Sequence, residues 1–169
     1  MSKNTAVTLG LLHLAIKTGN LEETRSFWVD VIGLNEVNRP NFGFPGAWLA
    51  CPQPGGQAII HVYAGGPALG ANNAAPIGTA AIDHISLACK GYHAYRHRFR
   101  ALGVDWREYL VPGTDLWQLF VYDPNGVQLE LTFEGGIEEA PSPDMSSDRV
   151  YRAGECFFEP HSPKKSAER

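Results

Sequence analysis

The chain repeats itself at an interval of about 70 residues, and this repeat limits the possible folds more than any other feature. His13, in Leu-Leu-His-Leu-Ala-Ile, corresponds to His84, in Ile-Asp-His-Ile-Ser-Leu, 71 positions later. His61, in Ile-Ile-His-Val-Tyr, corresponds to Glu130, in Gln-Leu-Glu-Leu-Thr, 69 positions later. Between these pairs, Ile-Gly-Leu at 32–34 recurs as Leu-Gly-Val, 70 positions on. The spacing predicts two equivalent modules in one fold.

Each module is predicted to contain a strand, a helix and three further strands. In the first module, residues 7–63, a helix is expected from Asn20, with Glu23 in a capping-box position and Gly33 after the helix end. The strands expected there are 7–17, 34–39, 46–51 and 56–63. In the second module, residues 81–133, the expected elements are strand 81–89, helix 91–102 and strands 105–111, 116–122 and 126–133.

The two modules are expected to form one domain over residues 1–133. Residues 64–80 are rich in glycine and proline and are predicted to link the modules. Residues 134–169 are predicted to form a peripheral C-terminal segment with a mobile end. The aromatic residues Tyr151, Phe157 and Phe158 indicate that part of this segment packs back on the domain.

The composition is that of a globular protein. The chain has 169 residues, 44% of them hydrophobic and 19% charged, which is sufficient for one buried core. A net charge of −4 gives no general attraction to nucleic acids or anionic membranes, so neither is expected as a partner. No apolar run approaches the roughly 20 residues that span a bilayer, and a cytoplasmic location is expected. The three cysteines are widely spaced and predict no disulfide framework.

Strand alternation places polar residues of the repeat on one face. Glu130 shares a face with Gln128 and Thr132, while Leu129 and Leu131 lie on the opposite face, where a helix would cover them. The three repeated histidines likewise fall on faces away from the apolar stripes. Because an unpaired buried carboxylate is costly, the polar face must line solvent or a ligand.

His13, His61, His84 and Glu130 together therefore predict one divalent-metal site. Each residue alone has a simpler interpretation as a hydrogen-bonded or partly solvated strand residue, and for His61 alone that interpretation is favoured. The joint pattern favours the metal site, because chance does not place ligand-type residues at matching repeat positions with the same facing.

The same segments resemble the vicinal oxygen chelate superfamily, which includes glyoxalase I, bleomycin and fosfomycin resistance proteins, methylmalonyl-CoA epimerase and extradiol dioxygenases. The resemblance covers roughly residues 9–133. In the first module it rests on His-Leu-Ala-Ile at 13–16 and on the segment 27–34. In the second module it rests on Asp-His-Ile-Ser at 83–86 and on Tyr-Asp-Pro-Asn-Gly-Val-Gln-Leu-Glu-Leu at 122–131. It implies an α+β fold in which two βαβββ modules form a curved, barrel-like mixed sheet around a metal-binding cavity. It also implies that His13, His84 and Glu130 are metal ligands, with His61 at the family's variable fourth position.

Among the activities that the resemblance implies, a ring-cleaving extradiol dioxygenase acting on a catechol-like small molecule is favoured. The metal would be Fe(II), with His61 as a second-sphere acid/base. The substrate-binding residues would be Trp48, Tyr63, Trp117, Phe120 and Gln128. One departure from that group is that Phe120 stands where the compared dioxygenases have a tyrosine, about ten residues before the glutamate.

Two alternatives remain open. In the first, His61 is a fourth ligand of Ni(II), Zn(II), Co(II) or Mn(II), and the protein is a glyoxalase I-like lyase or an epimerase/isomerase working through an enediolate. In the second, the protein is a non-catalytic small-molecule binding or resistance protein, against which the four intact ligand-type residues argue. The resemblance further implies a homodimer, in some relatives with a site shared between chains or with exchanged modules.

Overall fold

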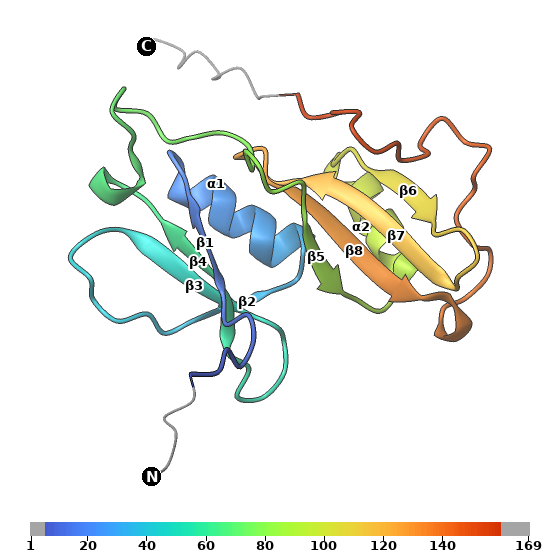
Figure 1. The fold of residues 1–169 in the computed structure, drawn as a ribbon, viewed down its shortest axis with the longest axis horizontal. Helices are drawn as coiled ribbons and strands as arrows, with labels where there is room; N and C mark the ends of the chain where they lie inside the picture. Colours follow the sequence, from blue (N-terminus) through green and yellow to red (C-terminus); the bar gives the residue numbers. More distant parts are fainter. Residues whose placement is uncertain (1–5, 160–169) are drawn as a thin grey trace.

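The first module is a four-stranded mixed sheet with a helix on one face (Figure 1). The computed structural model describes residues 6–159 of the chain. The elements of the first module are β1 (Leu14–Lys17), α1 (Leu21–Ser26), the π-helical turn η1 (Phe27–Val31), β2 (Asn35–Val37), β3 (Gly46–Ala50) and β4 (Ala58–Tyr63). The strand order is β1-β4-β3-β2, with β1 parallel to β4 and the remaining pairs antiparallel.

The second module repeats this arrangement after a linker that contains the short turn η2 (Gly66–Ala68). Its elements are β5 (Ile85–Ala88), α2 (Tyr92–Leu102), β6 (Arg107–Leu110), β7 (Leu116–Tyr122), β8 (Gln128–Glu134) and the turn η3 (Gly135–Ile137). The order β5-β8-β7-β6, with β5 parallel to β8, matches that of the first sheet. The predicted α+β class and the two βαβββ modules are confirmed. The eight strands form two separate sheets and not a closed barrel.

The first strand of each module is shorter than predicted. The apolar residues that extend the pattern before β1, among them Leu9, Leu11 and Leu12, are exposed by 63–97%. Ile82, before β5, is 56% exposed. These side chains carry the apolar pattern of a strand, but nothing in the described part of one chain covers them.

The predicted start and end of the first helix are confirmed. The Asn20 side chain accepts a hydrogen bond from the Glu23 amide at 3.2 Å, which satisfies a free donor of the first turn. After α1 the backbone continues as the π-helical turn η1. Gly33 then takes a φ of +87°, a conformation open to glycine at little steric cost.

The helix-covered faces of the two sheets meet in one hydrophobic core. Trp28 of η1 is fully buried, and its indole Nε1 donates to Asp123 Oδ2 in the turn between β7 and β8 at 3.3 Å. Tyr95 of α2 donates its hydroxyl proton to the carbonyl of Ile32 at 2.7 Å. Because α1, η1 and α2 pack into this shared core, the opposite face of each sheet is left for other partners.

Part of the C-terminal segment packs on the second module, as its aromatic residues predicted. Both carboxylate oxygens of Glu138 accept backbone N–H groups at the start of α2, from Gly91 and Tyr92, at 2.8 Å each. Further along, Val150 forms a parallel bridge with Glu108 of β6. The end of this segment is predicted to be mobile, and residues 160–169 lie outside the described residues. Between residues 6 and 159, no helix has the length and apolar character to cross a membrane.

Candidate metal site

His84 and Glu130 form one half of the candidate site, on the face of the second sheet opposite α2. His84 directly precedes β5, and Glu130 lies in β8, the parallel neighbour of β5. His84 Nε2 is 3.4 Å from Glu130 Oε2. Glu130 is only 9% exposed, so its carboxylate requires compensating partners.

Neighbouring polar side chains occupy the other atoms of this pair. Asp83 Oδ1 lies 2.6 Å from His84 Nδ1 and accepts a hydrogen bond from Nδ1–H, which leaves the lone pair on Nε2. Ser86 Oγ and Thr132 Oγ1 donate to Glu130 Oε1 at 2.6 and 2.8 Å. The atoms without these partners, Nε2 and Oε2, are those that face each other. Such partners orient the ligands in many protein metal sites.

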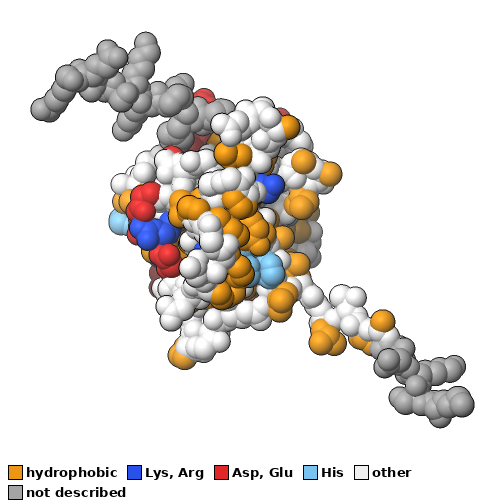
Figure 2. All heavy atoms as spheres, turned by 90° about the vertical axis from the view of Figure 1, so that its left-hand side faces the viewer, with side chains coloured by type: hydrophobic (Ala, Val, Ile, Leu, Met, Phe, Trp, Pro, Cys, Tyr) orange, Lys and Arg blue, Asp and Glu red, His pale blue; other side chains and the backbone are white. Residues whose placement is uncertain are grey.

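His13 and His61 form the other half, on the first sheet. His13 directly precedes β1, and His61 lies in β4, so their places match those of the first pair in the repeat. The two imidazole rings stack with centroids 3.9 Å apart, and His61 also stacks on Trp48 at 4.3 Å. Figure 2 shows this side of the molecule, with histidine set among hydrophobic side chains.

The surroundings of His61 favour its neutral form. Burial lowers the pKa of His61, and its electrostatic interactions with His13 and with Arg39 lower that pKa further. A neutral imidazole is the form that can bind a metal or accept a proton. His61 therefore suits either of the roles predicted for it.

Arg39 borders this first half-site with unused hydrogen-bond donors. Its guanidinium carbon lies 4.7 Å from the ring centroids of both Phe42 and Phe44, and Nη1 donates to the Phe44 carbonyl at 3.1 Å. Nε and Nη2 are buried and have no hydrogen-bond partner within the described chain. Buried donors of this kind usually have a partner, so the two nitrogens mark a place where an anion could be bound.

The four predicted ligands lie as two pairs within one chain and not as one cluster. Across residues 6–159, no group of three or more His, Cys, Asp or Glu side chains is placed to hold a metal ion. The reason is that each pair lies on its own sheet, and the faces that meet within the chain are the helix-covered ones. Within one chain the four ligands therefore do not gather in a single cavity, and a metal site that uses all four remains a prediction.

Four of the predicted substrate-binding residues lie beside these pairs. On the first sheet, Trp48 is the register partner of His61, and Tyr63 lies two positions beyond His61 on the same face. On the second sheet, Phe120 is the register partner of Glu130. Gln128, the fourth of these residues, precedes that glutamate by two positions on the same face.

The prediction for Trp117 is wrong. Its side chain is 6% exposed and packs edge-on against Tyr92 of α2, with ring centroids 5.2 Å apart. Trp117 and Phe120 are an odd number of positions apart on β7, so they point to opposite faces of the sheet. Alternation along the strand would have excluded one of the two from the site.

Two functional candidates were missed from the sequence. Asp83 directly precedes His84, and only the structure shows the contact between their side chains. Tyr151 lies over the second sheet, where its ring stacks on Phe120 with centroids 3.5 Å apart and an interplanar angle of 7°. The aromatic cluster of the C-terminal segment was visible in the sequence, but the residue against which it packs was not.

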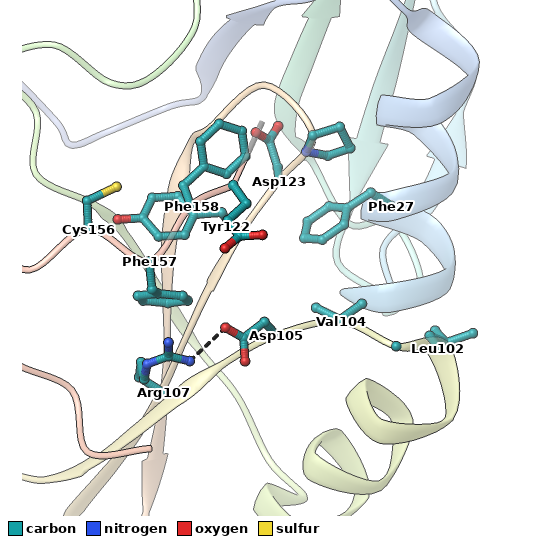
Figure 3. Close-up of a pocket in the computed structure, with 13 residues that line it drawn as sticks. Phe27, Leu102, Val104, Asp105, Arg107, Tyr122, Asp123, Cys156, Phe157 and Phe158 are labelled. Atoms are coloured by element: carbon teal, nitrogen blue, oxygen red, sulfur yellow. Dashed lines mark hydrogen bonds and ion pairs between the residues drawn. The ribbon is translucent and has the colours of Figure 1, made fainter. Parts of the chain in front are cut away.

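A cavity of about 790 Å³ lies apart from both pairs, at the junction of the two modules (Figure 3). Phe27, Arg107, Tyr122 and Phe157 are among the residues that line it, and Arg107 is paired with Asp105 at 2.8 Å. None of the four predicted ligands lines this cavity. The volume alone therefore does not identify the candidate site.

No protein-family model matches the chain, and no curated protein matches its sequence. Solved structures do match its fold. The fosfomycin resistance protein FosX from Listeria monocytogenes is 18% identical, with a TM-score of 0.57, over 75% of this chain and 94% of that one. Lactoylglutathione lyase from Agrobacterium tumefaciens is 18% identical, with a TM-score of 0.55, over 77% and 97%. An antibiotic-binding protein from Streptomyces is 13% identical, with a TM-score of 0.56, over 78% and 99%. The chain therefore has the same fold as these three proteins, and this fold agrees with the fold that the sequence resemblance implies.

Proposed function

We propose that this protein is a metal-dependent enzyme that acts on a small molecule with two neighbouring oxygen atoms. The observation that carries the proposal is that His84 Nε2 and Glu130 Oε2 face each other. The other side-chain polar atoms of these two residues are hydrogen-bonded, His84 Nδ1 to Asp83 and Glu130 Oε1 to Ser86 and Thr132. The fold supports the same proposal, because one structure of FosX contains Mn(II) and 1S,2S-dihydroxypropylphosphonic acid.

The donor set fits a divalent first-row metal. Imidazole nitrogens suit Fe(II), Ni(II), Co(II) and Zn(II), and a carboxylate oxygen also suits Mn(II). The ligands would be His84 and Glu130 with His13 and His61. Such an ion, when bound, acts as a Lewis acid that polarises an oxygen of the substrate.

We propose that two copies of the chain complete each site. One copy would supply His13 and His61, and the other copy would supply His84 and Glu130. This arrangement is supported by the separation of the two pairs within one chain. It is also supported by the exposed apolar residues that precede β1 and β5, since β1 and β5 are edge strands with a free side. A symmetric homodimer would contain two such sites, or one metal ion per chain.

The remaining side chains have roles in binding and proton transfer in this proposal. His61, whose neutral form is favoured because burial lowers its pKa, would be either the fourth ligand or the group that takes a proton from the substrate. Trp48 and Phe120 exclude water from the two halves. Arg39, with two unused donors beside the first half, would bind an anionic group such as a carboxylate or phosphonate.

The lyase or resistance-type reaction is the first candidate activity, because a lyase and a fosfomycin resistance protein are among the similar structures named above. The ring-cleaving dioxygenase favoured by the sequence is the second candidate. Two histidines and one carboxylate match the ligands of non-haem Fe(II) oxygenases, and the stacked rings of Phe120 and Tyr151 offer a surface for a planar substrate.

The test is metal analysis of the purified protein after separate reconstitution with Mn(II), Fe(II), Ni(II) and Zn(II). We expect about one ion per chain, and we expect His84→Ala to lose it. His97→Ala, a histidine change on the exposed side of α2, is the control and should bind normally. Unchanged metal content in His84→Ala would sink the proposal. Loss of fosfomycin, formation of lactoylglutathione and oxygen uptake with catechols would then distinguish the candidate activities.

A further inference from the structure

The part of the C-terminal segment around Tyr151 is held firmly against the second sheet. The Glu108 amide donates to the Arg149 carbonyl at 2.8 Å, and the Tyr151 amide donates to the Glu108 carbonyl at 2.9 Å. These bonds place the segment beside β6, where Val150 forms an isolated parallel β-bridge with Glu108. The Arg149 guanidinium also pairs with Asp105 at 2.7 Å. The backbone of Tyr151 is therefore fixed at the edge of the sheet.

From this edge the side chain of Tyr151 reaches back across the face that carries Glu130. Its ring stacks on Phe120 of β7, with centroids 3.5 Å apart. Its hydroxyl oxygen accepts a hydrogen bond from Gln128 Nε2 of β8 at 3.2 Å. Tyr151 thus crosses β6 and β7, and its polar end lies on β8, the strand of the candidate ligand.

The hydroxyl of Tyr151 lies close to the candidate metal ligand. Gln128 and Glu130 are two positions apart on the same face of β8, a strand repeat of about 7 Å. Phe120, against which the Tyr151 ring is stacked, is the cross-strand register partner of Glu130. A small molecule bound at the carboxylate would therefore meet the phenol end of Tyr151.

A second tyrosine fixes the direction of the hydrogen bonds. Tyr122 donates its hydroxyl proton to Gln128 Oε1 at 2.5 Å, so the amide oxygen is engaged and the amide nitrogen faces Tyr151. Because Tyr151 accepts from that nitrogen, its own proton remains to be donated. Within residues 6–159, the hydroxyl proton of Tyr151 has no hydrogen-bond acceptor. An oxygen atom of a bound substrate would be such an acceptor.

We infer that Tyr151 is a substrate-binding residue that donates a hydrogen bond to an oxygen of the molecule bound beside Glu130. The inference rests on the proposed function, since it takes this face as the substrate site. The ligand class is a small molecule with a hydroxyl, carbonyl or phosphonate oxygen next to its metal-binding pair. The C-terminal segment thereby takes part in substrate selection.

The test compares Tyr151→Phe with Tyr109→Phe. The first change removes the hydroxyl and keeps the ring on Phe120, and the second makes the same chemical change on the neighbouring strand β6, about 6.4 Å away between ring centroids. The affinity for Mn(II) is measured first, by the electron paramagnetic resonance signal of free Mn(II). The affinities for 1,2-dihydroxypropylphosphonic acid and for catechol are then measured by calorimetry, with and without Mn(II). Thermal melting checks that both variants fold.

We expect Tyr151→Phe to bind at least one probe about five-fold more weakly, with unchanged Mn(II) affinity, and Tyr109→Phe to bind normally. Equal probe affinity in Tyr151→Phe, or a parallel loss of Mn(II), would overturn the inference. Failure of the proposed function looks different, because the unaltered protein would then bind no Mn(II). If the unaltered protein binds no Mn(II), the probe affinities that are measured without metal show whether the Tyr151 hydroxyl contributes to binding. An unaltered protein that binds neither probe under either condition also overturns the inference.

Discussion

Asp83 Oδ1 lies 2.6 Å from His84 Nδ1, and this contact decides which nitrogen of the histidine is free to bind a metal. The carboxylate accepts a hydrogen bond from Nδ1–H and holds the ring so that Nε2 faces the Glu130 carboxylate at 3.4 Å. The corresponding position in the first module is Leu12, so the two halves of the candidate site are supported differently.

We predict that Asp83→Asn weakens Mn(II) binding by about 10–100-fold, because an amide no longer selects the tautomer that leaves Nε2 free. Isothermal calorimetry with Mn(II) measures the change. Asp30→Asn, a substitution at an exposed position on η1, is the matched control and should leave the affinity unchanged. Equal affinities in Asp83→Asn and Asp30→Asn would show that Asp83 does not orient a ligand.

We predict that Arg39→Gln weakens the binding of 1,2-dihydroxypropylphosphonic acid by about ten-fold and leaves Mn(II) binding unchanged. The physical reason is that Nε and Nη2 have no partner within the described residues and would donate to the anion. Arg152→Gln removes a guanidinium whose side chain is 70% exposed, and it serves as the control. A phosphonate affinity that is insensitive to Arg39 would exclude this arginine as the anion-binding group.

The sequence predicted the two modules well, because the repeat and the strand alternation are local properties of the chain. The sequence predicted that Glu130 lies on the sheet face opposite the helix, and the structure confirms this placement. It failed at Trp117, where two aromatic residues of β7 were assigned to one face although their spacing is odd. It also could not place Tyr151, whose contact with Phe120 depends on the path of a segment without periodicity.

The arrangement of the four ligands was also beyond the sequence. Matching repeat positions make His13 equivalent to His84, and His61 equivalent to Glu130, but equivalence does not bring the two pairs together. Whether the modules of one chain share a sheet face depends on how their helices pack. In this fold α2 and η1 meet in the common core, so the two pairs remain separate.

We predict that Glu138→Ala lowers the free energy of unfolding by about 1 kcal/mol, because two backbone N–H groups at the start of α2 lose their acceptor. For a chain of this size the melting temperature should fall by about 2–4 °C. Thermal unfolding followed by circular dichroism measures the shift. Glu139→Ala, at the neighbouring exposed position, should melt like the unaltered protein. A melting temperature that stays the same in Glu138→Ala would show that the C-terminal segment does not cap the helix.

We predict that the cysteine thiols react very differently with a disulfide reagent at pH 8. Burial raises the pKa of Cys89 to about 11, so little thiolate is present, whereas Cys156 is exposed. Cys156 should react first, and Cys89 only on unfolding; Cys156→Ser should abolish the fast phase. Because the pKa of Cys89 is raised above the usual thiol value of about 9, the stability linked to the neutral thiol is present below pH 9 and is lost as the pH approaches 11. A Cys89 that is modified as fast as Cys156 in the folded protein would contradict this prediction.

The shared metal site is tested most directly by mixing two inactive variants. One variant carries His13→Ala and His61→Ala, and the other carries His84→Ala and Glu130→Ala. After unfolding and refolding together, a mixed dimer would hold one intact site, with the two halves from different chains. We predict that neither variant alone binds Mn(II) and that the mixture recovers roughly a quarter of the normal metal content, since about half of randomly formed dimers are mixed. A mixture that binds no more Mn(II) than the separate variants would contradict a site formed between two copies of the chain.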